Sequence, residues 1–123
     1  MNDNLTIGEI SEIVKKFAEI RDWDQFNTAK DIAIGISTEA AEVLELFRFK
    51  TDKDIQEIFN DPKKKERVGE ELSDVLYFIV MMAQKYDINL GKEFMKKMDK
   101  NGEKYPVEKV KGINKKYNEY FDD

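Results

Sequence analysis

The stretch ISTEAAEVLELFRF, residues Ile36–Phe49, contains the pattern that decides the fold. Its apolar residues recur three and four positions apart, which is the spacing of one face of an α-helix. Carboxylates stand at every third position within it, at Glu39, Glu42 and Glu45. These acids need an explanation, because a helix face that packs against a core is normally free of unpaired charge.

The rest of the chain has the same helical periodicity, and most of the expected helices begin beside a residue that can cap them. The expected spans are Thr6 to about Arg21, Thr28 to about Phe49, Asp54 to Phe59, Pro62 to about Asp87, and Asn89 to about Asn101. No strand-like alternation runs for more than a few residues. The expected fold class is therefore all-α, as a four- to five-helix bundle in one domain, residues 1–123, with a mostly polar tail from about residue 107.

Composition excludes several classes of protein. At 123 residues the chain can bury one core, and its net charge of -5 argues against binding to a nucleic-acid backbone. Cysteine is absent, so disulfides and thiolate metal sites are excluded. No apolar run approaches the roughly 20 residues of a membrane span, and the opening residues MNDNLTIGEI lack the features of a secretion signal. We expect a cytoplasmic protein without nucleic-acid or membrane partners.

Histidine is also absent from the chain. This removes the usual general base, the commonest zinc ligand, and the Glu-x-x-His pairs of di-iron helix bundles. Any catalysis must then use carboxylates, amines, hydroxyls or a bound hard metal ion.

Helical geometry places the acids in two groups. At about 100° per residue, Glu39 and Glu42 project roughly 60° apart on the flank of their apolar stripe. On the expected long helix, Glu71 and Asp74 share a sector with apolar residues such as Phe78. Because a buried, unpaired carboxylate is costly, clustered acids on facing helices imply a compensating cation, either lysine and arginine side chains or a metal. Oxygen ligands alone suit Mg²⁺ or Mn²⁺, and magnesium commonly accompanies phosphate.

A simpler interpretation remains open. The spacing Glu-x-x-Glu also occurs on solvated helix faces, and this chain shows similar spacing at Glu9 and Glu12 and at Asp54 and Glu57. In that case the protein would be a non-catalytic helical oligomerisation module whose acids pair with lysines across an interface. Two acidic pairs within apolar sequence on successive long helices favour the metal.

Two segments make the pattern specific: STEAAEVLELF, residues 37–47, and GEELSDVLYF, residues 69–78. Their E-x-x-E and E-x-x-D signature resembles that of the all-α nucleoside triphosphate pyrophosphohydrolases, the MazG-like group. The segments RDWDQFNTAKDIAIGISTEAAEVLELF and KMDKNGEKYP resemble the dCTP pyrophosphatase subgroup in order and spacing. The resemblance extends from about Arg21 to Pro106 and supports the all-α bundle.

The resemblance implies an activity and a metal. Members of this group hydrolyse a nucleoside triphosphate with water to the monophosphate and pyrophosphate, and they use Mg²⁺, which Mn²⁺ could replace. The implied metal ligands are Glu39, Glu42, Glu71 and Asp74. Since no histidine is available, Glu42 or Glu39 is expected to be the catalytic base.

The resemblance also implies a set of substrate-binding residues. They are Trp23, Phe49, Phe78, Lys97, Asp99, Asn101 and Tyr105. Trp23 matches an aromatic residue of the base pocket, and the segment from Lys97 to Tyr105 contacts the nucleotide and its phosphates, with Lys104 or Arg48 as further phosphate contacts. Phe78 also has the register of a core residue.

Two positions depart from the dCTP enzymes. Val14 stands where they tend to have a histidine, and Phe49 stands where they tend to have a tryptophan. The expected substrate is dCTP or a related, modified pyrimidine deoxynucleotide, with weaker exclusion of other pyrimidines. The group's subunits pair, so we expect a homo-oligomer, and a tetramer is favoured over a dimer.

Overall fold

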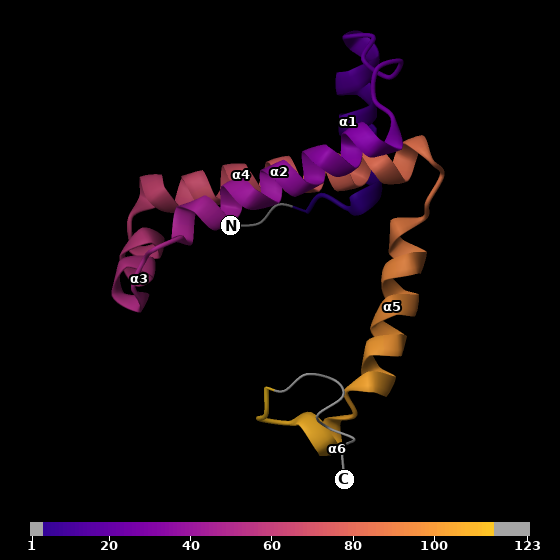
Figure 1. Ribbon diagram of the computed structural model, residues 1–123. Helices are drawn as coiled ribbons and strands as arrows, with labels where there is room; N and C mark the ends of the chain where they lie inside the picture. Colours follow the sequence, from indigo (N-terminus) through magenta and orange to yellow (C-terminus); the bar gives the residue numbers. More distant parts are fainter. Residues whose placement is uncertain (1–3, 115–123) are drawn as a thin grey trace. The chain divides into compact units, whose positions relative to one another are not determined.

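The computed structural model describes residues 4–114, and all the regular structure in this range is helical (Figure 1). The helices are α1 (Ile7–Ile20), α2 (Ala29–Phe47), α3 (Asp52–Asn60), α4 (Pro62–Lys85), α5 (Leu90–Lys104) and α6 (Val107–Val110). The all-α fold class expected from the sequence is confirmed. The chain divides after Ile88 into two compact units, with α1 to α4 in the first and α5 and α6 in the second.

Local chemistry explains where the helices begin. Three of them start with a capping box, in which a threonine hydroxyl accepts from the amide three residues later and that residue's carboxylate accepts from the threonine amide. The pairs are Thr6 with Glu9, Thr28 with Asp31, and Thr51 with Asp54. Helix α4 instead begins with Asp61, whose side chain accepts from two amides, followed by a proline in the first turn, as the sequence predicts.

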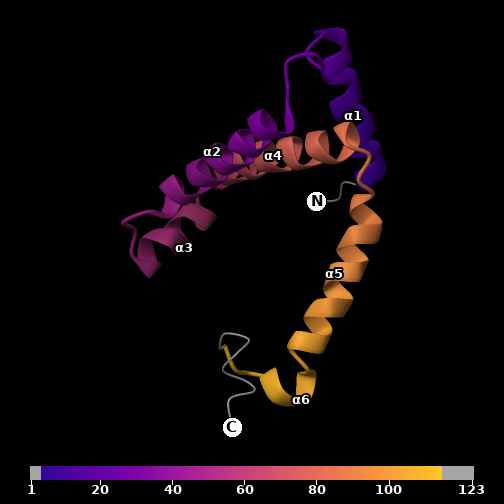
Figure 2. The same ribbon diagram turned by 45° about the vertical axis from the view of Figure 1, so that its right-hand side comes forward.

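The first unit is organised around α2 and α4, which run antiparallel and side by side in both views (Figures 1 and 2). Ile32 on α2 and Val80 on α4 are almost fully buried in this core. Gly35 allows the two helices to come close, because a Cβ atom at this position would lie 2.7 Å from the ring of Phe78. This close approach occurs one helical turn before Glu39.

Polar contacts join α1 and the following loop to the end of α4. Gln84 Nε2 donates to the carbonyl oxygen of Ser11 at 2.9 Å and to its hydroxyl at 3.0 Å. Lys85 Nζ donates to the carbonyl oxygens of Asp24, at 2.8 Å, and of Asn27. The loop that carries Trp23 is therefore attached to α4 at the end away from α3.

Some boundaries differ from those expected. Helix α2 ends at Phe47, two residues early, because Arg48 leaves the helical conformation and Phe49 adopts a φ of 62°. Helix α3 begins earlier than expected because Thr51 caps it.

Further differences occur near the end of the chain, where α5 continues three residues beyond Asn101 to Lys104. The short helix Val107–Val110 replaces the first part of the expected polar tail, and the part beyond residue 114 lies outside the described residues. Among the described residues, none of the helices has the length and apolar character needed to cross a membrane.

Candidate metal centre

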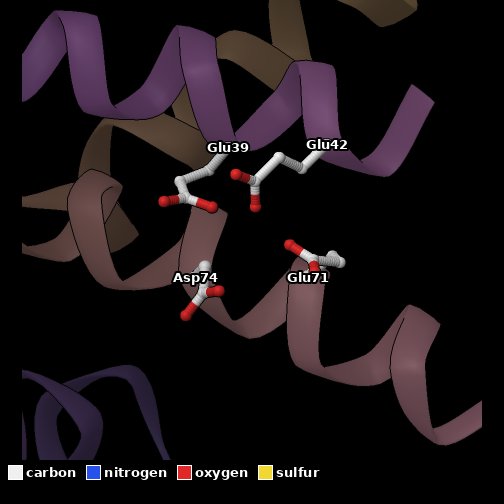
Figure 3. A group of neighbouring side chains, drawn as sticks. All are labelled: Glu39, Glu42, Glu71 and Asp74. Atoms are coloured by element: carbon white, nitrogen blue, oxygen red, sulfur yellow. The ribbon is translucent and has the colours of Figure 1, made fainter. Parts of the chain in front are cut away.

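The antiparallel pairing of α2 and α4 brings four carboxylates together. Figure 3 shows Glu39 and Glu42 projecting from α2 toward α4, where Glu71 and Asp74 lie one turn apart. Each residue offers a carboxylate oxygen that lies within 4.8 Å of the others. The four ligands predicted from the sequence thus form one cluster.

Burial is uneven across the cluster. Glu71 is only 5% exposed, Glu39 is half-buried, and Glu42 and Asp74 are exposed. The sequence placed both acids of α4 in the core sector, which is right for Glu71 and wrong for Asp74. Asp74 lies about 60° around the helix from Glu71, so it stands at the rim of the contact with α2.

Hydrogen bonding within the cluster is incomplete. Oε2 of Glu39 and Oε2 of Glu71 are buried, and neither has a hydrogen-bond partner. Arg67 Nε lies 2.9 Å from the other oxygen of Glu71, Oε1. Buried polar atoms are normally paired, and a cation between the two helices would satisfy both free oxygens. Four carboxylates without nitrogen or sulfur ligands fit Mg²⁺ or Mn²⁺.

Aromatic side chains form a second feature beside this cluster. Phe17 on α1 contacts Trp23 edge-on at 5.8 Å between ring centroids and Tyr77 at 6.0 Å, and Tyr77 contacts Phe78 at 5.3 Å. The guanidinium of Arg21 lies 3.7 Å from the centroid of Phe17. Because Tyr77 and Phe78 follow Asp74 by one turn of α4, the aromatic group adjoins the carboxylates along that helix.

The hydroxyl of Tyr77 is buried and has no hydrogen-bond partner. A tyrosine hydroxyl is protonated at neutral pH and can donate a hydrogen bond, and burial raises the pKa of Tyr77 further. Sequence reasoning missed this residue, because a tyrosine among core residues gives no sign that its hydroxyl lacks a partner.

Phe49 and Val14 stand in opposite environments. Phe49 is 89% exposed, and its ring carries the guanidinium of Arg48 at 4.7 Å from the centroid. Val14 is buried in the core. Val14, which stands where the dCTP enzymes tend to have a histidine, is thus a core residue of α1 in this chain.

The other predicted substrate residues belong to the second unit. Lys97, Asp99 and Asn101 lie on α5, and Tyr105 is the residue at its C-terminal end. Asn101 is half-buried and donates to Met98 Sδ at 3.8 Å. Their part in a nucleotide site stays a prediction.

Arg67 is the charged residue of this region that sequence reasoning overlooked. It precedes Glu71 by four residues, a spacing at which side chains on a helix meet. That spacing could have identified the pair, but a chain with 38% charged residues contains many such pairs. The burial of Glu71 is what distinguishes this one.

Comparisons with known proteins identify a matching family and several similar proteins. Residues 34–120 match the MazG-like family. The chain is 34% identical over 112 residues to dCTP pyrophosphatase 1 of Rattus norvegicus, a match covering 91% of this chain and 66% of that protein. It is 32% identical over 114 residues to dCTP pyrophosphatase 1 of Homo sapiens, covering 93% of this chain and 67% of that protein.

The fold of the chain is also similar to that of a solved structure. The crystal structure of a pyrophosphatase from Archaeoglobus fulgidus superposes with a TM-score of 0.75 at 31% identity, covering 86% of this chain and 97% of that one. The chain spans about two thirds of the length of the mammalian relatives, 66% for the rat protein. The family match includes all four carboxylates of the cluster. The chain belongs to the MazG-like family.

Proposed function

We propose that this chain is a metal-dependent nucleotide pyrophosphohydrolase, which converts a nucleoside triphosphate and water to the monophosphate and pyrophosphate. The observation that carries the proposal is the cluster of four carboxylates with two buried, unpartnered oxygens on facing helices. The names of the similar proteins, dCTP pyrophosphatase and pyrophosphatase, support the same reaction class.

In this proposal Glu39, Glu42, Glu71 and Asp74 hold Mg²⁺. Bound there, the ion would supply neutralisation of phosphate charge and a more acidic water. Glu42 is exposed and Glu39 is half-buried, so Glu42 is the better placed of the two to take a proton from a water that attacks the α-phosphorus.

The aromatic group is proposed to bind the nucleobase. Trp23 lies next to Phe17 and is 44% exposed, so one part of its ring surface is available for stacking. Phe78 closes the group on the side of Gly35. The exposed ring of Phe49 lies at the opposite end of α2 from Trp23, so within one chain it does not belong to this group. The names of the similar dCTP pyrophosphatases support dCTP or a related pyrimidine deoxynucleotide as the proposed substrate. Because stacking tolerates any base, we propose limited discrimination among pyrimidines.

Residues of α5 complete the proposal. Lys97, Asp99, Asn101 and Tyr105 are proposed to contact the nucleotide, with Lys97 holding phosphate oxygens as a point charge. Replacing Lys97 by methionine is expected to raise the KM for the triphosphate. An unchanged KM would remove α5 from the site without affecting the carboxylate cluster.

Reaction products test the proposal directly. Purified protein is incubated with a panel of ribo- and deoxynucleoside triphosphates in ¹⁸O-labelled water, with Mg²⁺, with Mn²⁺ or with a chelator. We expect metal-dependent release of pyrophosphate and incorporation of the label into the monophosphate. Label in orthophosphate together with a nucleoside diphosphate would contradict the proposal, as would equal turnover in the Glu42→Gln and Asp74→Asn variants.

The alternative function, a non-catalytic oligomerisation module, would pair these acids with lysines of another subunit. Within the described residues, the ion pair at this cluster joins Arg67 to Glu71 on the same helix. A protein that hydrolyses none of the nucleotides and does not respond to metal would favour this alternative.

A further inference from the structure

The ion pair between Arg67 and Glu71 joins an exposed residue to a buried one. The side chain of Arg67 is 62% exposed, and that of Glu71 is 7% exposed. The contact uses Nε of the guanidinium and Oε1 of the carboxylate, at 2.9 Å. Arg67 therefore reaches the buried acid from the solvent side of α4, one turn before it.

The two oxygens of Glu71 have different environments. Oε1 is held by Arg67, while Oε2 is buried without a hydrogen-bond partner in a cluster with Glu39, Glu42 and Asp74. A glutamate has three rotatable bonds, and fixing one oxygen restricts the position of the other. The contact with Arg67 therefore leaves Oε2 as the oxygen of Glu71 without a partner that could bind a cation.

We propose that Arg67 is a positioning residue of the metal centre, which holds Glu71 through Oε1 so that Oε2 is presented to the cation. This inference rests on the proposed metal-dependent function. Side chains that orient metal ligands in this way commonly contribute 10- to 100-fold to metal affinity. Arg67 also supplies a positive charge next to four carboxylates, which reduces their mutual repulsion before the metal binds.

The positive charge of Arg67 has an opposing effect on metal binding. It repels a divalent cation, so removing the charge would by itself strengthen metal binding. Because the guanidinium is mostly exposed, water and salt screen this repulsion. The orienting contact, in contrast, acts on a buried carboxylate that has no other described hydrogen bond. We therefore expect the orienting effect to dominate.

Substitutions can separate the two effects. Arg67→Met removes both the charge and the contact, whereas Arg67→Lys keeps the charge but cannot reproduce the Nε geometry. Lys96→Met is the control, because Lys96 pairs at 4.0 Å with Glu93 in an exposed ion pair on α5 that includes none of the four carboxylates. The side chains of Arg67 and Lys96 are both largely exposed, so these changes are expected to leave the fold intact.

The experiment measures Mn²⁺ binding to the full chain without nucleotide, from the free-ion signal in electron paramagnetic resonance. We expect the Kd for Mn²⁺ to rise 10- to 100-fold in Arg67→Met and by a similar factor in Arg67→Lys. Lys96→Met should stay within about twofold of the unaltered protein, since exposed ion pairs contribute little. Binding by Arg67→Met that is as tight as in the unaltered protein, or tighter, would overturn the inference.

Two other outcomes are also decisive. An Arg67→Lys variant with unaltered affinity would show that the charge, and not the orientation of Glu71, matters, which overturns the positioning role. Failure of the unaltered protein to bind Mn²⁺ would remove the metal centre and this inference together. Loss of the positioning role alone leaves metal binding and hydrolysis by the unaltered protein in place, so the two failures are distinguishable.

A measurement on the metal-free protein tests the contact independently. Denaturant unfolding is compared for Arg67→Met, Glu71→Gln and the double variant. If the contact orders Glu71, Arg67→Met should lower the unfolding midpoint in the original background and have a smaller effect when residue 71 is glutamine. Equal effects in both backgrounds would show that Arg67 does not act through Glu71.

Discussion

Phe49 combines an exposed aromatic ring with an unfavourable backbone conformation. It follows the end of α2 with a φ of 62°, in the left-handed region where glycine is usual after a helix. For an aromatic residue this conformation costs about 1–2 kcal/mol. Such strain often accompanies a functional requirement, and here the requirement would be an exposed ring for stacking.

Replacing Phe49 by glycine should therefore separate stability from substrate binding. We expect the free energy of unfolding to rise by about 1 kcal/mol, because the left-handed conformation becomes unstrained. The KM for the nucleotide should rise about tenfold, since stacking contributes about 1–3 kcal/mol per base. Chemical denaturation and steady-state kinetics measure the two effects.

Asp87 provides the control for backbone strain. It also has a positive φ, 53°, but it is not among the predicted substrate residues. Asp87→Gly should stabilise the protein slightly without changing the KM. If Phe49→Gly behaves in the same way, Phe49 has no contact with the base.

At the scale of elements, the approach of α2 to α4 depends on Gly35. A methyl group here would lie 2.7 Å from the ring of Phe78, so Gly35→Ala should force the ring or the helix to move. We expect a loss of about 1–3 kcal/mol in the free energy of unfolding. The shift should also weaken Mn²⁺ binding, because Glu39 is one turn away.

Gly69 is the matched control on the partner helix. A Cβ atom added there would meet nothing within 4 Å, so Gly69→Ala should stabilise the protein by about 0.5–1 kcal/mol. Thermal unfolding of the two variants measures the contrast. A Gly35→Ala variant as stable as Gly69→Ala would show that the helices do not approach closely at this position.

The capping boxes give the helices a predictable response to acid. Hydrogen bonds from the Thr28 amide and hydroxyl lower the pKa of Asp31, and Thr51 lowers the pKa of Asp54 in the same way. A carboxyl group whose pKa is lower in the folded state stabilises the fold above its ordinary value of 3.8. That contribution disappears as the pH falls through the lowered pKa.

Thr28→Ala removes the threonine hydroxyl, which donates to the Asp31 carboxylate and accepts from the Asp31 amide. We expect a lower Tm at neutral pH and a smaller further loss of Tm between about pH 5 and about pH 2. Ser37→Ala, at an exposed position within α2, should leave the acid dependence unchanged. Parallel Tm curves for Thr28→Ala and the unaltered protein would contradict the capping contribution.

At the scale of the whole molecule, the success of sequence reasoning depended on the kind of interaction. Helix starts could be predicted because they rest on contacts within four residues, as at Thr6 and at Asp61. The four carboxylates could be predicted because spacing and resemblance both indicated them. The partial exposure of Asp74 could not, since it depends on how far α2 covers α4.

Individual backbone conformations and side-chain contacts could not be predicted from the sequence. The left-handed conformation of Phe49 contradicts the preference of an aromatic residue, so no local rule predicts it. The unpartnered hydroxyl of Tyr77 and the pairing of Arg67 with Glu71 depend on burial, which the tertiary structure decides. The unpartnered hydroxyl and the ion pair also distinguish the candidate site from an ordinary pair of packed amphipathic helices.

Assembly is the remaining question at this scale. Large apolar side chains stay exposed in the single chain, including Leu44 on α2 at 61% and Leu72 on α4 at 54%. Extensive exposed apolar surface is typical of a face that another subunit covers. We therefore propose a homo-oligomer, with a tetramer favoured over a dimer.

Sedimentation velocity tests this assembly. We expect the unaltered protein to sediment as a tetramer, and Leu44→Glu or Leu72→Glu to shift it toward smaller species, because a charge buried in an interface without a partner is costly. Gln56→Glu, at an exposed position on α3, adds the same charge and should leave the assembly intact. A monomeric unaltered protein would contradict the assembly, and an unchanged species in both leucine variants would place the interface on other residues.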